Sequence, residues 1–291
     1  MILSVVIITQ NEEANLPRTL ESVKPLVSDG KGEIIVVDSG STDRTVEIAK
    51  SFGAKVFVEE WKGYAAQKNS AIDKATGDWL LSLDADEELD VQACDQMRQA
   101  LVAWQTASGL TDRIHADNFL ADPRTAPFVE AFTAATGAQP YAQGIYIRRK
   151  NFFLGRWIQH GGFWPDSKLR LFRRHSGRFQ ARLVHEDVEV HGVTGTLVSG
   201  ALLHHSYPTL SDYIEHMNRY SSLAAEMAVA DGRRAFSVIN IVLRPLATFI
   251  YNYFFRLGFL DGREGLLLHL YHAVYVSWKY AKAWELQNKS K

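Results

Sequence analysis

Three short apolar runs rich in β-branched residues, each ended by a polar cluster, constrain the fold of this chain most. They cover residues 3–9, 33–37 and 79–83. Strands that are buried on both faces of a parallel sheet have this unbroken apolar character. Strands that alternate with helices form right-handed βαβ units, so the pattern predicts an α/β fold with a mostly parallel sheet. The intervening segments predict helices at 16–27, about 44–52 and about 64–75, and one further strand at 55–58.

Polar residues follow each of these runs at the point where the expected strand ends. The clusters lie at residues 9–12, 38–43 and 84–88. In open α/β sheets, ligands bind outside the carboxyl ends of the strands. We therefore expect the three clusters to converge on one crevice.

Charge and cysteine content exclude several classes of protein. The 291 residues carry a formal charge of −1 and the pI is near 6.8, so no global positive field favours a nucleic-acid partner. Cys94 is the only cysteine, which excludes an internal disulfide and a cysteine-built zinc site and fits a reducing cytosol. The first ten residues lack a basic segment and a cleavage site, and they predict no signal peptide.

The sequence as a whole suggests a catalytic domain over 1–205 and a helical tail over 206–291. Within the first, residues 1–105 form the expected nucleotide-binding half. Residues 107–143 have no clear period and read as an insertion or lid. Interleaved basic and aromatic residues characterise the acceptor half, residues 144–205.

The tail is apolar and aromatic without containing a clean span of about 20 apolar residues. Helical segments are expected at 210–230 and 235–284, the second interrupted by Arg244, Pro245, Arg256 and a turn at 261–264. Basic residues outnumber acidic ones, and such helices suit the membrane interface. The sequence therefore predicts a cytoplasmic protein, peripheral on the inner face of the cytoplasmic membrane.

Asp84 and Asp86 flank one alanine directly after a buried run. A bend at the strand end would let one carboxylate meet a metal while the other reaches a ribose or a metal-bound water. Mg²⁺ or Mn²⁺ there would neutralise a leaving diphosphate. An isolated pair of acidic residues more often lies in a solvated loop. The prediction of a metal site therefore depends on the position of this pair directly after the strand.

Two more residues have competing interpretations. Asp38 could accept from a nucleobase N–H, with Gly40 permitting a tight turn, or it could form an Asx-turn that caps the next helix. Lys68 could meet the phosphates of a donor, although a lone helical lysine usually lies on a solvated face.

Four motifs in this order resemble family 2 glycosyltransferases of the GT-A (Rossmann-like) fold: VIITQNEE at 6–13, VDSGSTD at 37–43, QKN at 67–69 and LDADE at 83–87. A second set resembles the lipopolysaccharide-core β-glucosyltransferases of the WaaE-like subgroup. Its members are NFFLGRW at 151–157, PDSKLRLFR at 165–173, VHE at 184–186 and LH at 203–204.

The resemblance implies a UDP-sugar donor, a divalent metal and inversion at the anomeric carbon by direct displacement. It places Asp38 on uracil, Lys68 near the base or phosphates, and Asp84 and Asp86 on the ribose and the metal. It also implies donor contacts for Thr9, Asn11, Glu12 and Ser39.

Inversion requires a general base that deprotonates the acceptor hydroxyl. The resemblance favours Glu186 for this role, with Asp187 as the alternative. His204 is a structural histidine or a metal ligand. Arg170 reaches the donor phosphate or the anionic groups of the acceptor, or is a surface residue.

The expected activity is transfer of a sugar, glucose from UDP-glucose, to a lipopolysaccharide-core or other lipid-linked glycan. A polyprenyl-phosphate glycosyltransferase is the alternative enzyme, and a non-catalytic, membrane-associated scaffold that binds nucleotide sugars is the alternative of another class. No Gly-x-Gly-x-x-Gly follows the first run, which argues against a dehydrogenase. The segment 107–143 departs from the subgroup pattern and leaves the acceptor open.

Overall fold

The computed structural model describes residues 3–30, 32–111, 126–180, 187–232 and 236–289. These residues form two compact units. The first contains the described residues up to Arg149 together with 167–180 and 187–203. The second contains residues 150–166 and 204–289.

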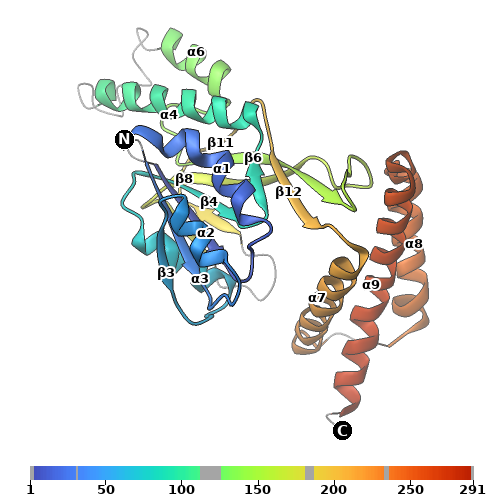
Figure 1. Ribbon diagram of the computed structural model, residues 1–291. Coiled ribbons are helices and arrows are strands. Elements are labelled where there is room, and N and C mark those ends of the chain that lie inside the picture. Colours follow the sequence, from blue (N-terminus) through green and yellow to red (C-terminus); the bar gives the residue numbers. More distant parts are fainter. Residues whose placement is uncertain (1–2, 31, 112–125, 181–186, 233–235, 290–291) are drawn as a thin grey trace. The chain divides into compact units, whose positions relative to one another are not determined.

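A mixed sheet forms the framework of the first unit (Figure 1). Strands β1 (Leu3–Thr9), β2 (Gly32–Asp38), β3 (Lys55–Val58) and β4 (Trp79–Asp84) pair in parallel in the order β3-β2-β1-β4. The four strands expected from the sequence are thereby confirmed to within one residue at each end. β8 (Asp166–Arg173) then joins β4 in the antiparallel direction.

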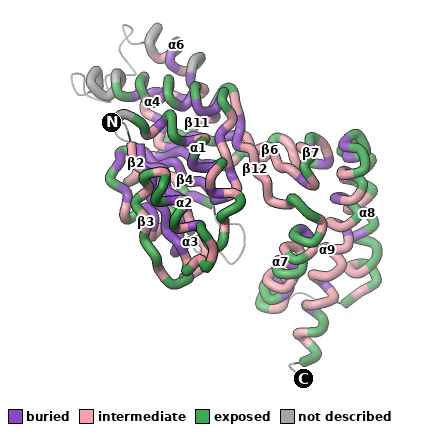
Figure 2. Tube along the Cα trace, in the orientation of Figure 1, coloured by how far each residue is buried: buried purple, intermediate pink, exposed green. Residues whose placement is uncertain are grey.

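Helices cover both faces of this sheet because consecutive strand residues point to opposite sides. Val5 and Ile7 pack in a cluster with residues of α1 (Leu16–Val27), α2 (Thr45–Ser51) and α4 (Val91–Thr111). Val6, between them, packs with residues of α3 (Tyr64–Lys74) on the other face. Figure 2 shows the buried strands between these helices. The predicted α/β fold with a mostly parallel sheet is confirmed.

Shorter strands extend the sheet beyond β8. Its order continues as β6 (Gly144–Phe153), β12 (Leu202–Tyr207) and β5 (Glu87–Leu89). β5 begins directly after Asp86, so the sheet holds the acidic segment on both sides. β11 (Thr194–Thr196) and β7 (Arg156–Trp157) pair with β6, and β9 (Gly177–Phe179) pairs with β10 (Val188–Val190).

The segment without sequence period contains helical structure. α4 continues to Thr111, and α6 spans Ala126–Thr136. Phe132 of α6 packs against Trp104 of α4, with ring centroids 5.7 Å apart. Trp104 in turn stacks on Trp79 of β4 at 4.4 Å. α6 is therefore joined to the core of the sheet through a chain of aromatic rings.

The second unit is mainly helical. α7 (Leu210–Ala230) matches the expected helix and begins with a capping box between Thr209 and Asp212. The second expected helical segment, 235–284, is divided into several parts. They are η2 (Ile239–Leu243), α8 (Arg244–Ile250), η3 (Tyr251–Phe255), η4 (Gly258–Asp261) and α9 (Gly262–Lys289).

Two residues account for the division. Pro245 lacks the N–H that would bond the carbonyl of Ile241, and the hydroxyl of Ser277 donates to that carbonyl at 3.0 Å instead. Leu257 has a φ of 61°, a left-handed conformation that ends a helix. Among the described residues, no helix combines the length and apolarity needed to cross a bilayer.

Candidate functional site

The strand register aligns the polar clusters at one edge of the sheet. Thr9 of β1 pairs with Asp38 of β2, and Ile8 pairs with Asp84 of β4. The hydroxyl of Thr19 on α1 donates to the carbonyl of Ala85 at 2.7 Å and ties the third cluster to the first. The predicted convergence of the three clusters is confirmed.

Asp38 organises the loop that follows its strand. Its side chain is 1% exposed. One carboxylate oxygen accepts from the Thr9 hydroxyl at 3.0 Å, and the other accepts from the backbone N–H groups of Gly40 at 2.9 Å and Ser41 at 2.8 Å. Gly40 has a φ of 83°, which a residue without Cβ adopts freely. The Asx-turn is therefore present, and a base N–H would have to share oxygens that already accept hydrogen bonds.

The loops after β1 and β2 hold each other by reciprocal hydrogen bonds. The backbone N–H of Asn11 donates to the Ser41 hydroxyl, and the Asn11 side-chain oxygen accepts from the N–H of Thr42, both at 2.8 Å. Asn11 has a φ of 55°, a conformation that asparagine tolerates well. The next N–H, of Glu12, donates to the Thr45 hydroxyl at 2.8 Å. This edge is rigid before any ligand arrives.

Two groups at this edge suit a ligand. The hydroxyl of Ser39 is buried and has no hydrogen-bond partner among the described residues, and such a group usually finds one. Burial, followed by the negative charges of Asp86, Asp43 and Asp84, raises the pKa of Glu12. The acids therefore create a negative potential that a bound cation would relieve.

Asp84 is held by two cations from different elements. One carboxylate oxygen lies 2.6 Å from the ammonium of Lys68 on α3, and the other lies 2.7 Å from the guanidinium of Arg170 on β8. Both basic side chains are almost fully buried, with exposed fractions of 7% and 6%. Lys68 is thus not on a solvated face, and Arg170 is not a surface residue.

Glu87 completes this network, and sequence reasoning did not single it out. Its carboxylate is fully buried and pairs with Arg170 at 2.7 Å and Arg149 at 3.0 Å. It also accepts from the backbone N–H of Asp84 at 3.2 Å. Burial alone would lower the pKa of Arg170, but Glu87 and Asp84 raise it on balance. The only sequence signal was the acidic run 84–88, in which Glu87 looks like its neighbours.

Within the acidic segment, Asp84 and Asp86 differ in how well they suit a divalent metal. The described residues contain no preformed group of three or more His, Cys, Asp or Glu side chains that could hold one. Asp84 is already neutralised by Lys68 and Arg170. Asp86 is half-buried, and its charge contributes to the raised pKa of Glu12. The donor set fits a hard cation bound through Asp86 and completed by the oxygens of a ligand.

The remaining candidates lie elsewhere. Glu186, the expected base, falls outside the described residues. Asp187 is exposed and precedes β10, and its carbonyl accepts from the N–H of Gln180 at 3.3 Å. His204 belongs to the second unit, where Nδ1 contacts the side-chain oxygen of Asn151 and the ring contacts the Ser206 hydroxyl, each at 2.8 Å.

Comparisons with known proteins show the family of this chain. The model of the family described as glycosyl transferase family 2 matches residues 4–176. A protein of Rickettsia typhi named "Uncharacterized glycosyltransferase RT0209" is 29% identical over 299 residues, covering 99% of this chain and 89% of that protein. LpsC of Rhizobium meliloti, a lipopolysaccharide core biosynthesis glycosyltransferase, is 28% identical over 294 residues, with coverages of 97% and 92%.

A solved structure also aligns with most of the chain. It is the mannosyltransferase PcManGT from Pyrobaculum calidifontis in complex with GDP-Man and Mn²⁺. The identity is 14% and the TM-score is 0.46, over 97% of this chain and 86% of that chain. This overall similarity is too low to support any assignment of residues.

Proposed function

This chain belongs to glycosyl transferase family 2, and we propose that it is an inverting enzyme that transfers glucose from UDP-glucose to a lipid-linked glycan such as a lipopolysaccharide core. The observation that carries the proposal is the ion network around Asp84. Lys68, Arg170 and Glu87 hold this carboxylate in place at the carboxyl edge of the sheet. Enzymes gain rate from charged groups that are positioned before the reaction begins.

The donor nucleotide would lie along the edge formed by β1, β2 and β4. Asp38 and Thr9 form the wall on which the uracil would rest, and the unpartnered Ser39 hydroxyl would supply a polar contact. Asp84 would accept from the ribose hydroxyls while its charge is balanced by Lys68 and Arg170. Asn11 and Glu12 would border the same site from the loop after β1.

Asp86 would hold Mg²⁺ or Mn²⁺ against the diphosphate. When bound, the cation neutralises the negative charge that develops as the diphosphate leaves. Asp86 suits this role better than Asp84, since both oxygens of Asp84 already contact cations. His204 is a weaker candidate ligand, because its ring already contacts Asn151 and Ser206.

The base is proposed to be Glu186, with Asp187 as the alternative. A carboxylate at the acceptor hydroxyl would remove its proton as the oxygen attacks the anomeric carbon, and attack from the side opposite the diphosphate inverts that centre. Glu186→Gln keeps the shape of the side chain but cannot take the proton. Near-normal turnover by this variant would move the base to Asp187.

The acceptor is proposed to be membrane-bound, on the inner face of the cytoplasmic membrane. The similar protein LpsC is named for lipopolysaccharide core biosynthesis. Many large apolar residues between Phe236 and Leu260 are exposed, and the only charged residues in that stretch are Arg244 and Arg256. Helices of this composition bind at the interface of anionic membranes. A polyprenyl-phosphate acceptor would use the same donor edge and is the second candidate.

The proposal is tested by a donor screen. The purified chain is incubated with a panel of UDP-sugars, with and without Mn²⁺, and with lipid extracts as acceptors. We expect metal-dependent UDP release that is highest with UDP-glucose, and mass spectrometry should show one added hexose on a glycolipid. A hexose on polyprenyl phosphate supports the second candidate. No UDP release with any donor would favour the non-catalytic scaffold.

A further inference from the structure

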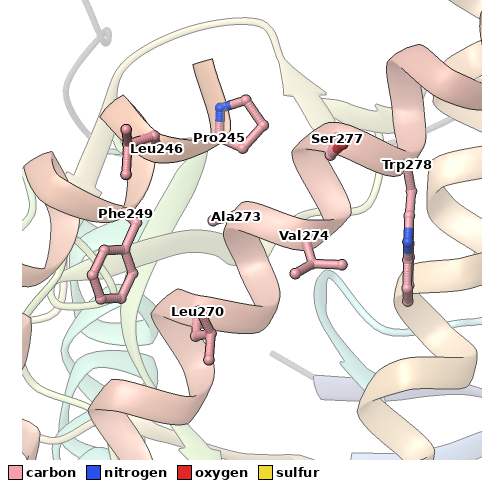
Figure 3. A pocket seen from close by; sticks show the side chains of 8 residues that line it. All are labelled: Pro245, Leu246, Phe249, Leu270, Ala273, Val274, Ser277 and Trp278. Carbon is pink, nitrogen blue, oxygen red and sulfur yellow. The ribbon is translucent and has the colours of Figure 1, made fainter. Parts of the chain in front are cut away.

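A groove between helices α8 and α9 is lined by none of the residues proposed for the transfer reaction. It has a volume of about 480 Å³, within the range of about 300–1,000 Å³ that small-molecule sites occupy. Figure 3 shows its walls. The lining residues are Pro245, Leu246 and Phe249 of α8 and Leu270, Ala273, Val274, Ser277 and Trp278 of α9.

The lining is almost purely apolar. Ser277 is the one hydroxyl in it, and that hydroxyl donates to the carbonyl of Ile241, the carbonyl that Pro245 cannot bond. Little in the wall is therefore left to recognise a polar ligand. An apolar chain would meet carbon atoms along most of its length.

The two ends of the groove differ in charge. The two segments run antiparallel here, because Tyr253 lies against His269 whereas Ile241, earlier in the chain, lies against Ser277 at the opposite end. At that end, the guanidinium of Arg244 lies 2.7 Å from the Tyr280 hydroxyl and 5.5 Å from the centre of its ring. The Arg244 residue is nonetheless exposed. One end thus offers a cation to solvent while the rest is hydrocarbon.

The surface around the groove is apolar as well. Leu246 and Leu270, on opposite walls, are 52% and 46% exposed. The neighbouring exposed residues Val242, Leu243, Ile250 and Leu266 continue this surface on the same helical segments. An apolar rim of this kind marks a site that opens toward a partner of the same character.

We propose that the groove between α8 and α9 holds one acyl chain of an anionic membrane phospholipid, with the phosphate of its head group at Arg244. The apolar wall, the volume of the groove and the cation at one end match an amphiphile of this kind. The inference rests on the proposed contact of the tail with a membrane. It adds to that contact a defined lipid site that fixes the helices at one depth in the lipid interface.

The test uses the full chain and vesicles of phosphatidylcholine that contain phosphatidylglycerol with a photoactivatable group near the end of one acyl chain. After irradiation, mass spectrometry locates the label. We expect it to concentrate on the peptides that carry Phe249 and Leu270, the end away from Arg244. Label spread evenly over the exposed apolar residues of the tail would overturn the proposal.

Ala273→Phe places a ring in the middle of the groove. We expect it to lower the labelling of Phe249 and Leu270 by about tenfold, the cost of losing roughly two buried methylene contacts. Co-sedimentation with the vesicles should stay close to that of the wild-type chain. Ala247→Phe adds the same ring on α8 outside the groove and should leave the labelling unchanged. Equal labelling in all three proteins would overturn the proposal.

Leu270→Gln serves where Ala273→Phe disturbs folding, since an exposed wall residue tolerates an amide. Like Ala273→Phe, this variant should lower the labelling of Phe249. The photoactivatable lipid in phosphatidylcholine form should label the groove less than the phosphatidylglycerol form, and equal labelling would contradict the role of Arg244. A concentration-dependent dimer that Ala273→Phe abolishes and lipid does not compete would make a second copy the occupant and overturn the proposal.

These results are separable from the proposed transfer reaction. UDP release reports on the donor edge in the first unit, whereas labelling reports on the groove in the second unit. A chain that sediments with vesicles but shows no label in the groove keeps its membrane contact and loses only the lipid site. A chain without UDP release that is labelled at Phe249 keeps the lipid site and loses the proposed activity.

Discussion

At the carboxyl ends of β1, β2 and β4, buried charges are paired with opposite charges within the protein, whereas on η2, α8, η3 and α9 large apolar side chains are exposed. Asp84 contacts two buried cations, while Phe255 is 76% exposed. Buried charges cost free energy unless they are paired, and exposed apolar surface costs free energy in water. The charges of the first region are therefore balanced without a macromolecular partner. The apolar surface of the second region would be stabilised by contact with an apolar partner.

We therefore assign the transfer reaction to the sheet edge, and attachment of the protein to the membrane to the helical tail. A substitution at the sheet edge should then lower turnover with every acceptor or destabilise the fold. A change on the tail surface should affect only processes that need lipid. The following experiments test that division, beginning with the largest expected effect.

Asp86→Asn should lower kcat for metal-dependent UDP release by at least about a hundredfold, because a divalent cation contributes several kcal/mol to the stabilisation of a leaving diphosphate. Steady-state rates across a Mn²⁺ titration provide the measurement. Asp95→Asn is the control, since Asp95 is an exposed acid on α4 that pairs with Arg98 of the same helix. Full activity of Asp86→Asn at saturating Mn²⁺ would remove Asp86 from the metal site.

Glu87→Gln should destabilise the first unit by about 3–5 kcal/mol, because it leaves the buried Arg149 and Arg170 without a shared counter-charge. Urea unfolding and hydrogen exchange of the β4 amides measure the effect. Glu21→Gln removes an exposed pair with Lys24 and should change stability by only about 0–1 kcal/mol. A similar small change for both variants would show that the network does not hold the edge together.

The tail unit should lose stability at a higher pH than the sheet unit. Burial, and to a lesser degree His272, lowers the pKa of His269 to about 4, while Asp261 acts in the opposite direction. An unfolded histidine titrates near 6.5, so the unfolded state binds more protons between pH 6.5 and 4. Stability therefore falls as the pH falls through that window, by about 1–3 kcal/mol. Hydrogen exchange of α9, corrected for intrinsic rates, should show this loss.

Glu33 provides the contrast in the sheet unit. Burial by itself would raise its pKa, but hydrogen bonds from Lys55, Ser4 and Thr76 lower the pKa to about 2. Its contribution is complete above about pH 4.5 and is lost as the pH falls toward 2. His269→Phe should flatten the pH dependence of α9 between 6.5 and 4 and leave β2 unchanged. An unaltered pH profile of α9 in this variant would assign the effect to another group.

Phe254→Ser combined with Phe255→Ser should weaken binding to vesicles of phosphatidylcholine and phosphatidylglycerol by about tenfold, with little change in folding stability. Each ring loses part of the roughly 1.5–3 kcal/mol that burial of such a side chain provides, and both are already exposed in water. Co-sedimentation measures the change. Val91→Ser alters a 78% exposed apolar residue on α4 and should have no effect.

The order and spacing of the apolar runs predicted the sheet edge well. Because the period of a buried strand and its polar end are local features, Thr9, Asp38 and Asp84 could be placed together before any contact was known. The partners of Asp84 depended on distant segments. Arg170 reaches it from 86 residues further along the chain, and no local pattern carries that information.

The same limit explains Glu87. Five consecutive positions from Asp84 to Glu88 include four acids, and sequence does not reveal which of them becomes buried. Glu87 is the acid that is fully buried, because it pairs with Arg149 on β6 and Arg170 on β8. In the tail, helical content was predicted correctly. Interruptions of the segment 235–284 at Pro245 and at 261–264 were expected, whereas the end of a helical segment at Leu257 was not, because leucine seldom adopts a left-handed backbone conformation.

The central claim is that the edge formed by β1, β2 and β4 binds a uridine nucleotide with a divalent cation. Calorimetric titration of the chain with UDP, with and without Mn²⁺, measures this directly. The structure leads us to expect one UDP per chain, bound at least about tenfold more tightly with Mn²⁺ present, because the cation neutralises charge between Asp86 and the diphosphate. Equal affinity with and without Mn²⁺, or no binding of UDP at all, would contradict the account.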